Sequence, residues 1–305
     1  MPQAPLASPA TEPFGTAPFG PTHPLGSGHP ALSRRRELGA TSARSLLLTV
    51  LGEFVLPRTE AVWTQTLIDV LGALGVEEKS ARQALARTAA EGLLESDRSG
   101  RRVRWSLTAQ GRRLLTDGAA RIYGFGSPAG RWDGRWLVLL VSVPESRRQL
   151  RHRLRTRLAW AGLGSPTPGV WVTPDPTKQD EVARVIAELQ LAEVTSSFVG
   201  PFGAIGAEQD VVAQAWDLAG IEAAYADFLD TFRTATPTSP GDVMTAQITL
   251  VHAWRRFPFL DPALPVELLP AEWAGARAAE LFGALHARWD GPAQRHWRSL
   301  LGAAP

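Results

Sequence analysis

The stretch that decides the fold is GVEEKSARQALARTAAEGLLESDRSGRRVRW, residues 75–105. Its first part predicts a helix after a tight turn at Gly75 and Val76, because small and apolar residues recur at the helical period. The residues expected to face inward are Ala81, Leu85, Thr88 and Gly92. Glu77 and Glu78 suit the positive end of the helix dipole, and they indicate where the helix begins.

The opposite face of this predicted helix is polar and basic. Its members are Lys79, Arg82, Gln83 and Arg87. In a DNA major groove, arginine donates two hydrogen bonds to guanine, glutamine pairs with adenine, and lysine meets phosphate. We therefore expect Arg82 and Gln83 to contact base edges, and Lys79 and Arg87 to contact phosphates. The alternative is an ordinary solvated helix face.

A basic hairpin is predicted directly after the helix. Leu94–Ser96 and Arg101–Trp105 are the expected strands, and Asp97–Gly100 is the expected turn. Such a hairpin would lie along the phosphates or in the minor groove. Its candidate DNA-binding residues are Arg98, Arg101, Arg102 and Arg104.

Two further helices are predicted before this stretch, over Ala43–Val55 and Val62–Leu74. Helix, helix, DNA-reading helix and basic hairpin is the order of a winged helix-turn-helix. Thr108 is expected to cap one more helix, which ends at Tyr123. The prediction is a winged helix-turn-helix DNA-binding domain over residues 41–123.

Charge is distributed unevenly along the chain of 305 residues, a length that favours two or three domains. Residues 1–180 carry 24 Lys and Arg against 15 Asp and Glu, a net +9. Residues 181–305 carry 8 against 15, a net −7. The first part therefore favours a polyanion as partner, and the last part would repel one.

Several classes of protein are disfavoured by what the sequence lacks. There is no cysteine for a disulfide or thiolate, no apolar run of 18 residues and no signal pattern, so we expect a cytoplasmic protein without a membrane partner. The six histidines have no metal-ligand spacing, and no nucleotide-binding or hydrolase motif is present. We expect no enzyme, no cofactor and no metal.

The first 40 residues are expected to form a disordered tail, since the first thirty include eight prolines and four glycines. Arg34–Arg36 at its end could contact DNA as a basic arm, although we favour a solvated charge run. Gly124–Gly134 has the composition of a linker.

A second domain is predicted over residues 131–205. Arg135–Val143 is almost continuously apolar, as in a strand buried on both faces. Alternating helices and strands after it favour a small ferredoxin-like domain. These elements are a basic helix at Ser146–Gly162, a strand at Val170–Thr173, a helix at Asp180–Leu191 and a strand at Glu193–Gly200.

The remainder, residues 206–305, predicts a helical domain. Glu208–Thr234 has the pattern of one long amphipathic helix, and Thr236–Gly241 of a loop. Val243–Leu301 is expected to be helical, with proline-rich elbows at 258–270. The predicted fold class is therefore α+β, mostly α.

At several places the sequence resembles the PaaX family of bacterial repressors of phenylacetate catabolism. The resemblance covers about residues 40–290, beginning with ARSLLLTVLGEF (43–54). It continues through the predicted DNA-reading helix and then through Gly100–Arg102, Leu107-Thr108, Gly111 and Arg121–Gly124. Its most specific part is HAWRRFPFLDPALPVELLPAEWAG (252–275).

This resemblance implies a homodimeric repressor of double-stranded operator DNA, with a middle domain like Cas2. It also implies an aryl-CoA thioester as inducer, typically phenylacetyl-CoA. Cas2 nucleases place a metal-binding aspartate late in the first strand, where this chain has Ser142. We therefore expect no nuclease activity.

A candidate effector site is found in the acidic last domain, where one group combines cations and aromatic rings. Its residues are His252, Trp254, Arg255 and Arg256. Guanidinium groups suit the phosphates of CoA, and apolar rings suit its aryl end. The other interpretation, which we favour from the residues alone, is a structural clamp in which Arg255 and Arg256 pair with Asp261 or Glu267.

The basic helix has three interpretations: pairing with the acidic last domain, which we favour, a second DNA surface, or a cradle for the CoA phosphates. Its arginines are Arg147, Arg148, Arg151, Arg153, Arg155 and Arg157. Two other functions for the whole chain stay open. One is an acyl-CoA-handling enzyme or sensor that docks on a protein partner, and the other is a DNA binder without an inducer.

Overall fold

A computed structural model describes residues 42–126 and 131–303. We refer to residues 42–126 as the N-terminal region, 131–206 as the middle region and 207–303 as the C-terminal region. The expectations for the tail at 1–40, for Arg34–Arg36 and for residues 127–130 of the linker lie outside the described residues.

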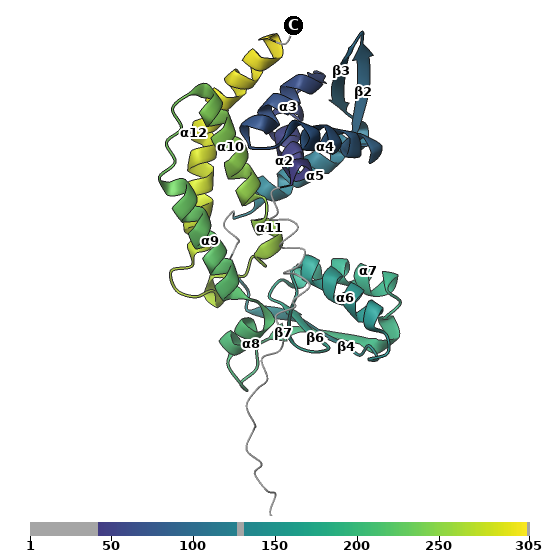
Figure 1. Ribbon diagram of the computed structural model, residues 1–305. Helices are drawn as coiled ribbons and strands as arrows, with labels where there is room; N and C mark the ends of the chain where they lie inside the picture. The colour runs from purple at the N-terminus through teal and green to yellow at the C-terminus, as the bar shows by residue number, and fades with distance from the viewer. Residues whose placement is uncertain (1–41, 127–130, 304–305) are drawn as a thin grey trace, which may run out of the picture.

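The N-terminal region combines helices with a small sheet (Figure 1). Its helical elements are α2 (Ala43–Val50), the π-helical turn η1 (Leu51–Val55), α3 (Thr64–Ala73), α4 (Glu78–Ala90) and α5 (Ala109–Gly124). Its strands, β1 (Val62–Trp63), β2 (Leu94–Ser99) and β3 (Arg102–Leu107), form an antiparallel sheet in the order β1-β3-β2. Thr108 caps α5 as predicted, because its hydroxyl accepts a hydrogen bond from the Gly111 amide at 3.0 Å.

Three local predictions for this region were wrong. Val62 and Trp63 do not start the second helix, because they pair with β3 as strand β1. The hairpin turns at Gly100-Arg101, since Asp97 and Arg98 pair within the ladder and Gly100 has a φ of +62°. Gly92 lies past the end of α4 with a φ of +74°, a conformation that glycine adopts without strain.

The middle region is a four-stranded antiparallel sheet whose chain order is strand, helix, strand, strand, helix, strand, as in ferredoxin-like folds. Its strand order is β5-β6-β4-β7. The elements are β4 (Arg135–Val141), α6 (Arg148–Trp160), β5 (Gly164–Thr167), β6 (Val170–Thr173), η2 (Pro176–Lys178), α7 (Gln179–Glu188), η3 (Ala192–Val194) and β7 (Thr195–Pro201). Strand β5 was not predicted, because Gly-Ser-Pro-Thr carries no strand pattern.

Side chains along β4 point alternately to the two faces of the sheet, and both faces are covered. Leu137 and Leu139 pack with α6 and α7, whereas Trp136 packs with Val212 of α8 (Glu208–Ala215). Helix α8 belongs to the sequence predicted as one helix over 208–234, and that prediction was wrong. Trp216 is extended and the Asp217 carboxylate caps the next helix, α9 (Leu218–Arg233). The break lets α8 cover the sheet while α9 leaves it.

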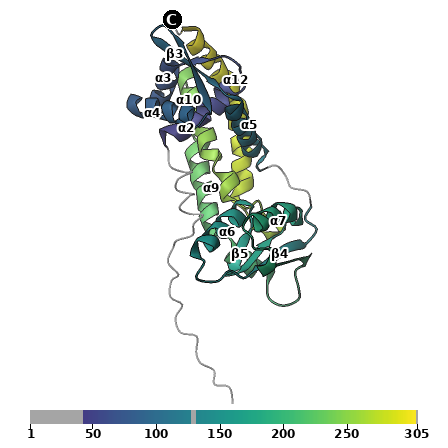
Figure 2. The ribbon, with the colours of Figure 1, turned by 90° about the vertical axis from the view of Figure 1, so that its right-hand side faces the viewer.

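The remaining C-terminal helices are α10 (Pro240–Trp254), α11 (Phe257–Leu260), η4 (Val266–Leu268) and α12 (Ala274–Ala303). Figures 1 and 2 show α9, α10 and α12 side by side along the length of the molecule, with the middle region at one end. The N-terminal region lies beside the other end of α10 and α12. Its core includes Met244 and Ile248 of α10 and Ala293 and Trp297 of α12.

Candidate nucleic-acid interface

Helix α4 is held by a small buried face. Ala81, Leu85 and Thr88 are at most 1% exposed, and α4 packs on both α2 and α3. The hydroxyl of Thr88 donates to the Ala84 carbonyl at 2.8 Å, so its polar atom is satisfied inside the core. Three of the four predicted inward positions are therefore buried as expected.

The opposite face of α4 is open. Lys79, Arg82, Gln83 and Arg87 are all exposed. The guanidinium of Arg82 donates to the Glu78 carboxylate at 2.7 Å, and its side chain remains 53% exposed. Such an exposed pair contributes little to stability, so Arg82 can exchange Glu78 for another acceptor at small cost.

The hairpin β2–β3 is fixed to the start of α3. The Trp105 indole donates to the Thr64 hydroxyl at 2.8 Å, and that hydroxyl donates to the Val103 carbonyl at 2.9 Å. Pairing of β1 with β3 adds a second connection. The hairpin therefore has a set position relative to α3 and α4.

The four hairpin arginines divide into two kinds. Arg98, Arg101 and Arg102 are exposed near the tip. Arg104 is half-buried, pairs with Asp97 on the opposite strand, and lies over the Trp63 ring with 5.4 Å to its centroid. Arg104 therefore has partners within the N-terminal region, whereas the other three form no ion pair among the described residues.

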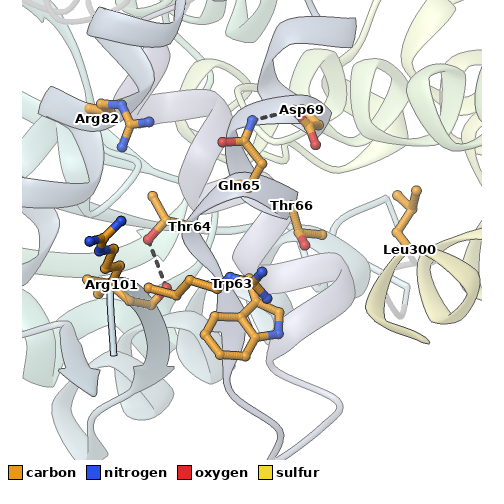
Figure 3. A pocket seen from close by; sticks show the side chains of 10 residues that line it. Trp63, Thr64, Gln65, Thr66, Asp69, Arg82, Arg101 and Leu300 are labelled. Atoms are coloured by element: carbon orange, nitrogen blue, oxygen red, sulfur yellow. Dashed lines mark hydrogen bonds between the residues drawn. The ribbon is translucent and has the colours of Figure 1, made fainter. Parts of the chain in front are cut away.

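A hollow of about 560 Å³ lies between α3, α4 and the hairpin. Figure 3 shows Arg82 and Arg101 on the same side of it, with Thr64 between them. Its lining residues are Trp63, Thr64, Gln65, Thr66, Asp69, Arg82, Arg101, Arg102, Val103 and Leu300. The first turn of α3 contributes to this lining, and free backbone amides at a helix start favour anions. The arrangement is suited to phosphate.

The candidate effector residues lie in a different environment. Trp254 is fully buried, and its indole donates to the Ile122 carbonyl at 3.2 Å. Its ring stacks on Phe282 with 4.7 Å between centroids. In this conformation Trp254 is part of the aromatic core of the C-terminal region.

His252 and Arg255 hold α10 against α2. The Arg255 guanidinium donates to the Ser45 carbonyl at 2.8 Å and to the Thr49 hydroxyl at 3.2 Å. The same hydroxyl lies 3.1 Å from Nδ1 of His252. Burial, with a smaller contribution from the charge of Arg255, lowers the pKa of His252 to about 4. His252 is therefore neutral at physiological pH.

Arg256 faces the other side of α10. Its guanidinium donates to the Ala224 carbonyl of α9 at 3.3 Å and lies over the Phe257 ring at 5.1 Å. Burial lowers its pKa, and the charge of Asp227 opposes that shift. The four candidate residues thus lie around the end of α10 without sharing one open face.

A buried polar cluster between the N- and C-terminal regions was missed in the sequence. The Glu53 carboxylate accepts hydrogen bonds from the Tyr123 hydroxyl and, at 3.1 Å, from the Gln247 amide. His286 Nε2 lies 3.3 Å from the same carboxylate, and Gln294 donates to the Glu53 carbonyl at 3.0 Å. Burial, with the charge of Glu53, raises the pKa of Tyr123 above its ordinary value. The sequence signal that could have indicated this cluster is Glu53, the single acidic residue within the largely apolar stretch 46–56.

The favoured interpretation of the basic helix was wrong. Arg151 lies 3.6 Å from the Glu145 carboxylate, and Arg157 pairs with Glu188 of α7. Within the described ranges, no ion pair joins the arginines of α6 to the acidic C-terminal region. The charge of one region is therefore not neutralised by the other.

Two kinds of feature are absent from the part of the chain that the structure describes. It contains no group of three or more His, Cys, Asp or Glu residues placed to hold a metal ion. Nor does any described helix combine the length and apolar character that crossing a membrane requires.

Comparisons with known proteins give consistent matches along the chain. Family models match residues 42–111 (PaaX-like protein), 129–212 (PaaX protein central Cas2-like domain) and 216–299 (PaaX-like protein C-terminal domain). The transcriptional repressor PaaX of Escherichia coli strain K12 is 32% identical over 251 residues, which cover 79% of this chain and 78% of that protein.

A similar fold is found in a solved structure. It is the uncharacterized protein Rv0674 from Mycobacterium tuberculosis, with a TM-score of 0.60. The match covers 85% of this chain and 98% of the other, at 23% sequence identity. At that identity the likeness concerns the fold alone.

Proposed function

This chain belongs to the PaaX family, and we propose that it is a transcriptional repressor that binds operator DNA through a winged helix-turn-helix. Helix α4 enters the major groove, and the hairpin β2–β3 is the wing. The observation that carries this proposal is the division of α4 into a buried face and a face whose basic and amide side chains are all exposed.

The roles of the side chains follow from their chemistry and exposure. Arg82 and Gln83 read base edges, and Lys79 and Arg87 contact phosphates. Phosphate is also the target of the exposed wing arginines, which are Arg98, Arg101 and Arg102. Arg104 reaches phosphate only if it leaves Asp97, so its main contribution is the shape of the wing.

Binding as a homodimer explains how a single short helix gains specificity. Two copies of α4 would enter successive major grooves of an imperfect palindrome, with half-sites about 34 Å apart. A change in the distance between the two helices then weakens both contacts together. This geometry gives the effector a simple way to release DNA.

The repressed genes are those of an aromatic, phenylacetate-type catabolic operon, and the effector is an aryl-CoA thioester such as phenylacetyl-CoA. The core shared by the two terminal regions supports communication between effector and DNA. Phe54 of η1 stacks on Trp297 of α12 with 5.2 Å between ring centroids. Because close-packed cores transmit displacements, a shift of α12 would move the N-terminal helices.

The end of α10 is the proposed effector site, and its contacts suggest how release occurs. Phosphates of the effector would compete with the Ser45 carbonyl for Arg255, and His252 would lose its place beside Thr49. That exchange frees α2, on which α4 packs. Trp254 has no exposed surface, so its contribution to the site is to support it as part of the underlying core. A ~100-fold preference of the effector for the released state corresponds to about 2.7 kcal/mol.

A gel shift with the DNA upstream of the protein's own gene tests the proposal, at fixed salt with and without phenylacetyl-CoA. We expect a retarded complex that phenylacetyl-CoA releases and that free CoA or free phenylacetate leaves intact. If ~6 phosphates are contacted, affinity falls ~10³-fold between 50 and 200 mM salt. No complex at low salt would contradict DNA binding, and a complex insensitive to the thioester would contradict the effector.

A further inference from the structure

Helix α6 of the middle region carries a concentration of positive charge that the proposed function does not use. It has no acidic residue from Arg148 to Trp160. Its five arginines are Arg148, Arg151, Arg153, Arg155 and Arg157. Leu154 and Leu158 attach the helix to the sheet, so its position is fixed by the core of the middle region.

The five arginines differ in their partners. Arg151 and Arg157 flank the buried face and lie beside Glu145 and Glu188. The remaining three are exposed, and no ion pair of theirs occurs among the described residues; they are Arg148, Arg153 and Arg155. The free charge of α6 is therefore on the side that faces solvent.

The start of α6 is unfavourable for these charges when nothing is bound. Arg147 is the N-cap, and Arg148 follows at the end of the helix where the dipole repels cations. Together with Arg153 they line a hollow of about 450 Å³. An anion in this hollow would satisfy both the arginine side chains and the free backbone amides of the first turn.

The location of α6 indicates which anion would bind to it. Figure 1 shows α6 on the same side of the molecule as α4 and the hairpin, whereas α9 and α12 lie on the opposite side. Figure 1 thus places α6, α4 and the hairpin, all rich in arginine, on one side, and α9, whose sequence has a net charge of −2, on the other. A duplex that contacts α4 can therefore continue along the side that carries α6.

We propose that α6 is a second contact surface for the DNA backbone, made by Arg148, Arg153 and Arg155. It would bind phosphates next to the half-site that α4 occupies, without reading bases. The middle region would then help to set the register of the repressor on DNA. This inference rests on the proposed function.

The test compares two triple variants in salt titrations of operator binding by fluorescence anisotropy. The first is Arg148→Ala, Arg153→Ala and Arg155→Ala. The second removes the same charge from exposed helix positions of the C-terminal region, with Arg233→Ala, Arg277→Ala and Arg288→Ala. Alanine favours helix, so both variants should unfold at the wild-type temperature or above.

We expect the α6 variant to reduce the slope of log affinity against log salt by about 2–3, close to 0.9 for each lost phosphate contact. The control variant should keep the wild-type slope. A nonspecific duplex should show the same reduction, because the contact does not depend on sequence. Equal slopes for the α6 variant and the control would overturn the inference while leaving wild-type DNA binding in place. Failure of the proposed function would instead appear as no binding by the wild-type protein.

Discussion

The exposed face of α4 and the end of α10 carry similar side chains, yet the fold gives them opposite environments. Arg82 on α4 is 53% exposed and has a partner one helical turn away. Arg255, directly after α10, is half-buried and donates to the Ser45 carbonyl, 210 residues away in the sequence. The chemistry of an arginine side chain determines which acceptors it can bind. Its burial determines whether the acceptor belongs to this chain or to another molecule.

This difference gives the two faces complementary roles in the proposed repressor. The cations of α4 have no strong partner in the free protein and remain available to DNA. The cations of α10 connect the C-terminal helices to α2, which in turn supports α4. An effector that takes Arg255 would therefore act on the DNA-binding surface through two packed helices. The following predictions run from the largest expected effect to the smallest.

The connection between the regions depends most on Trp297, which is fully buried against Phe54. Trp297→Ala should lower the free energy of unfolding by about 3–5 kcal/mol, because it leaves a large cavity in a shared core. Chemical denaturation followed by circular dichroism measures the loss. A loss below ~1 kcal/mol would mean that the N-terminal region folds independently of α12, and the proposed route for the effector would fail.

Loss of the Arg255 contacts at the end of α10 should lower the free energy of unfolding more than loss of the Arg82 contact on α4. Arg255→Ala removes hydrogen bonds to Ser45 and Thr49 and should cost about 2 kcal/mol, as for hydrogen bonds from a charged donor. Arg82→Ala loses only an exposed pair and should change stability by ~0.5 kcal/mol or less. The same denaturation experiment measures both. Equal losses would remove the distinction between the two faces.

The environment of His252 makes stability depend on pH. The unfolded chain takes up a proton on this side chain near pH 6.5, whereas in the folded chain the lowered pKa of His252 is about 4. The contribution is therefore fully present above pH 6.5 and is lost as pH falls toward 4. Since the side chain is only partly buried, we expect an effect on the order of 1 kcal/mol.

The variant His252→Gln tests that contribution, because glutamine remains neutral and can still reach the Thr49 hydroxyl. Unfolding free energies measured from pH 7 to pH 4 should fall less steeply for the variant than for wild type. If the two profiles are parallel, His252 does not titrate differently in the folded and unfolded states.

Within the hairpin β2–β3, the same comparison predicts a small difference between two arginines. Arg101→Ala should reduce the salt slope of DNA binding by about 0.9, as expected for one lost phosphate contact. Arg104→Ala should leave that slope almost unchanged, because Arg104 is engaged by Asp97 and Trp63. Salt titrations of DNA binding by both variants measure the two slopes. A larger change for Arg104 would reverse the roles assigned to them.

Local patterns predicted the DNA-binding candidate better than they predicted contacts between distant segments. The period of α4 and the charge of the hairpin lie within 31 consecutive residues, so their geometry follows from local spacing. Strand β1 was missed because only two residues form it, and its partner Trp105 lies more than forty positions later. The ladder there overrides the helical pattern of Val62–Leu74.

The candidate effector site shows what the sequence could not supply. Cations and rings at 252–256 indicated ligand chemistry, but their partners Ser45 and Ile122 belong to the other end of the chain. The carboxylate of Glu53 likewise gathers donors from three distant helices. Such contacts depend on how α10 and α12 pack on the N-terminal region, and no periodicity within one segment encodes that packing.

The most direct test of the account is the ratio of operator affinity to nonspecific affinity in the double variant Arg82→Ala and Gln83→Ala. Fluorescence anisotropy at one salt concentration gives both affinities for wild type and variant. We expect the ratio to fall by about 1–3 kcal/mol per lost base contact, with nonspecific binding largely retained. A variant that keeps the wild-type ratio would contradict the claim that α4 reads the operator.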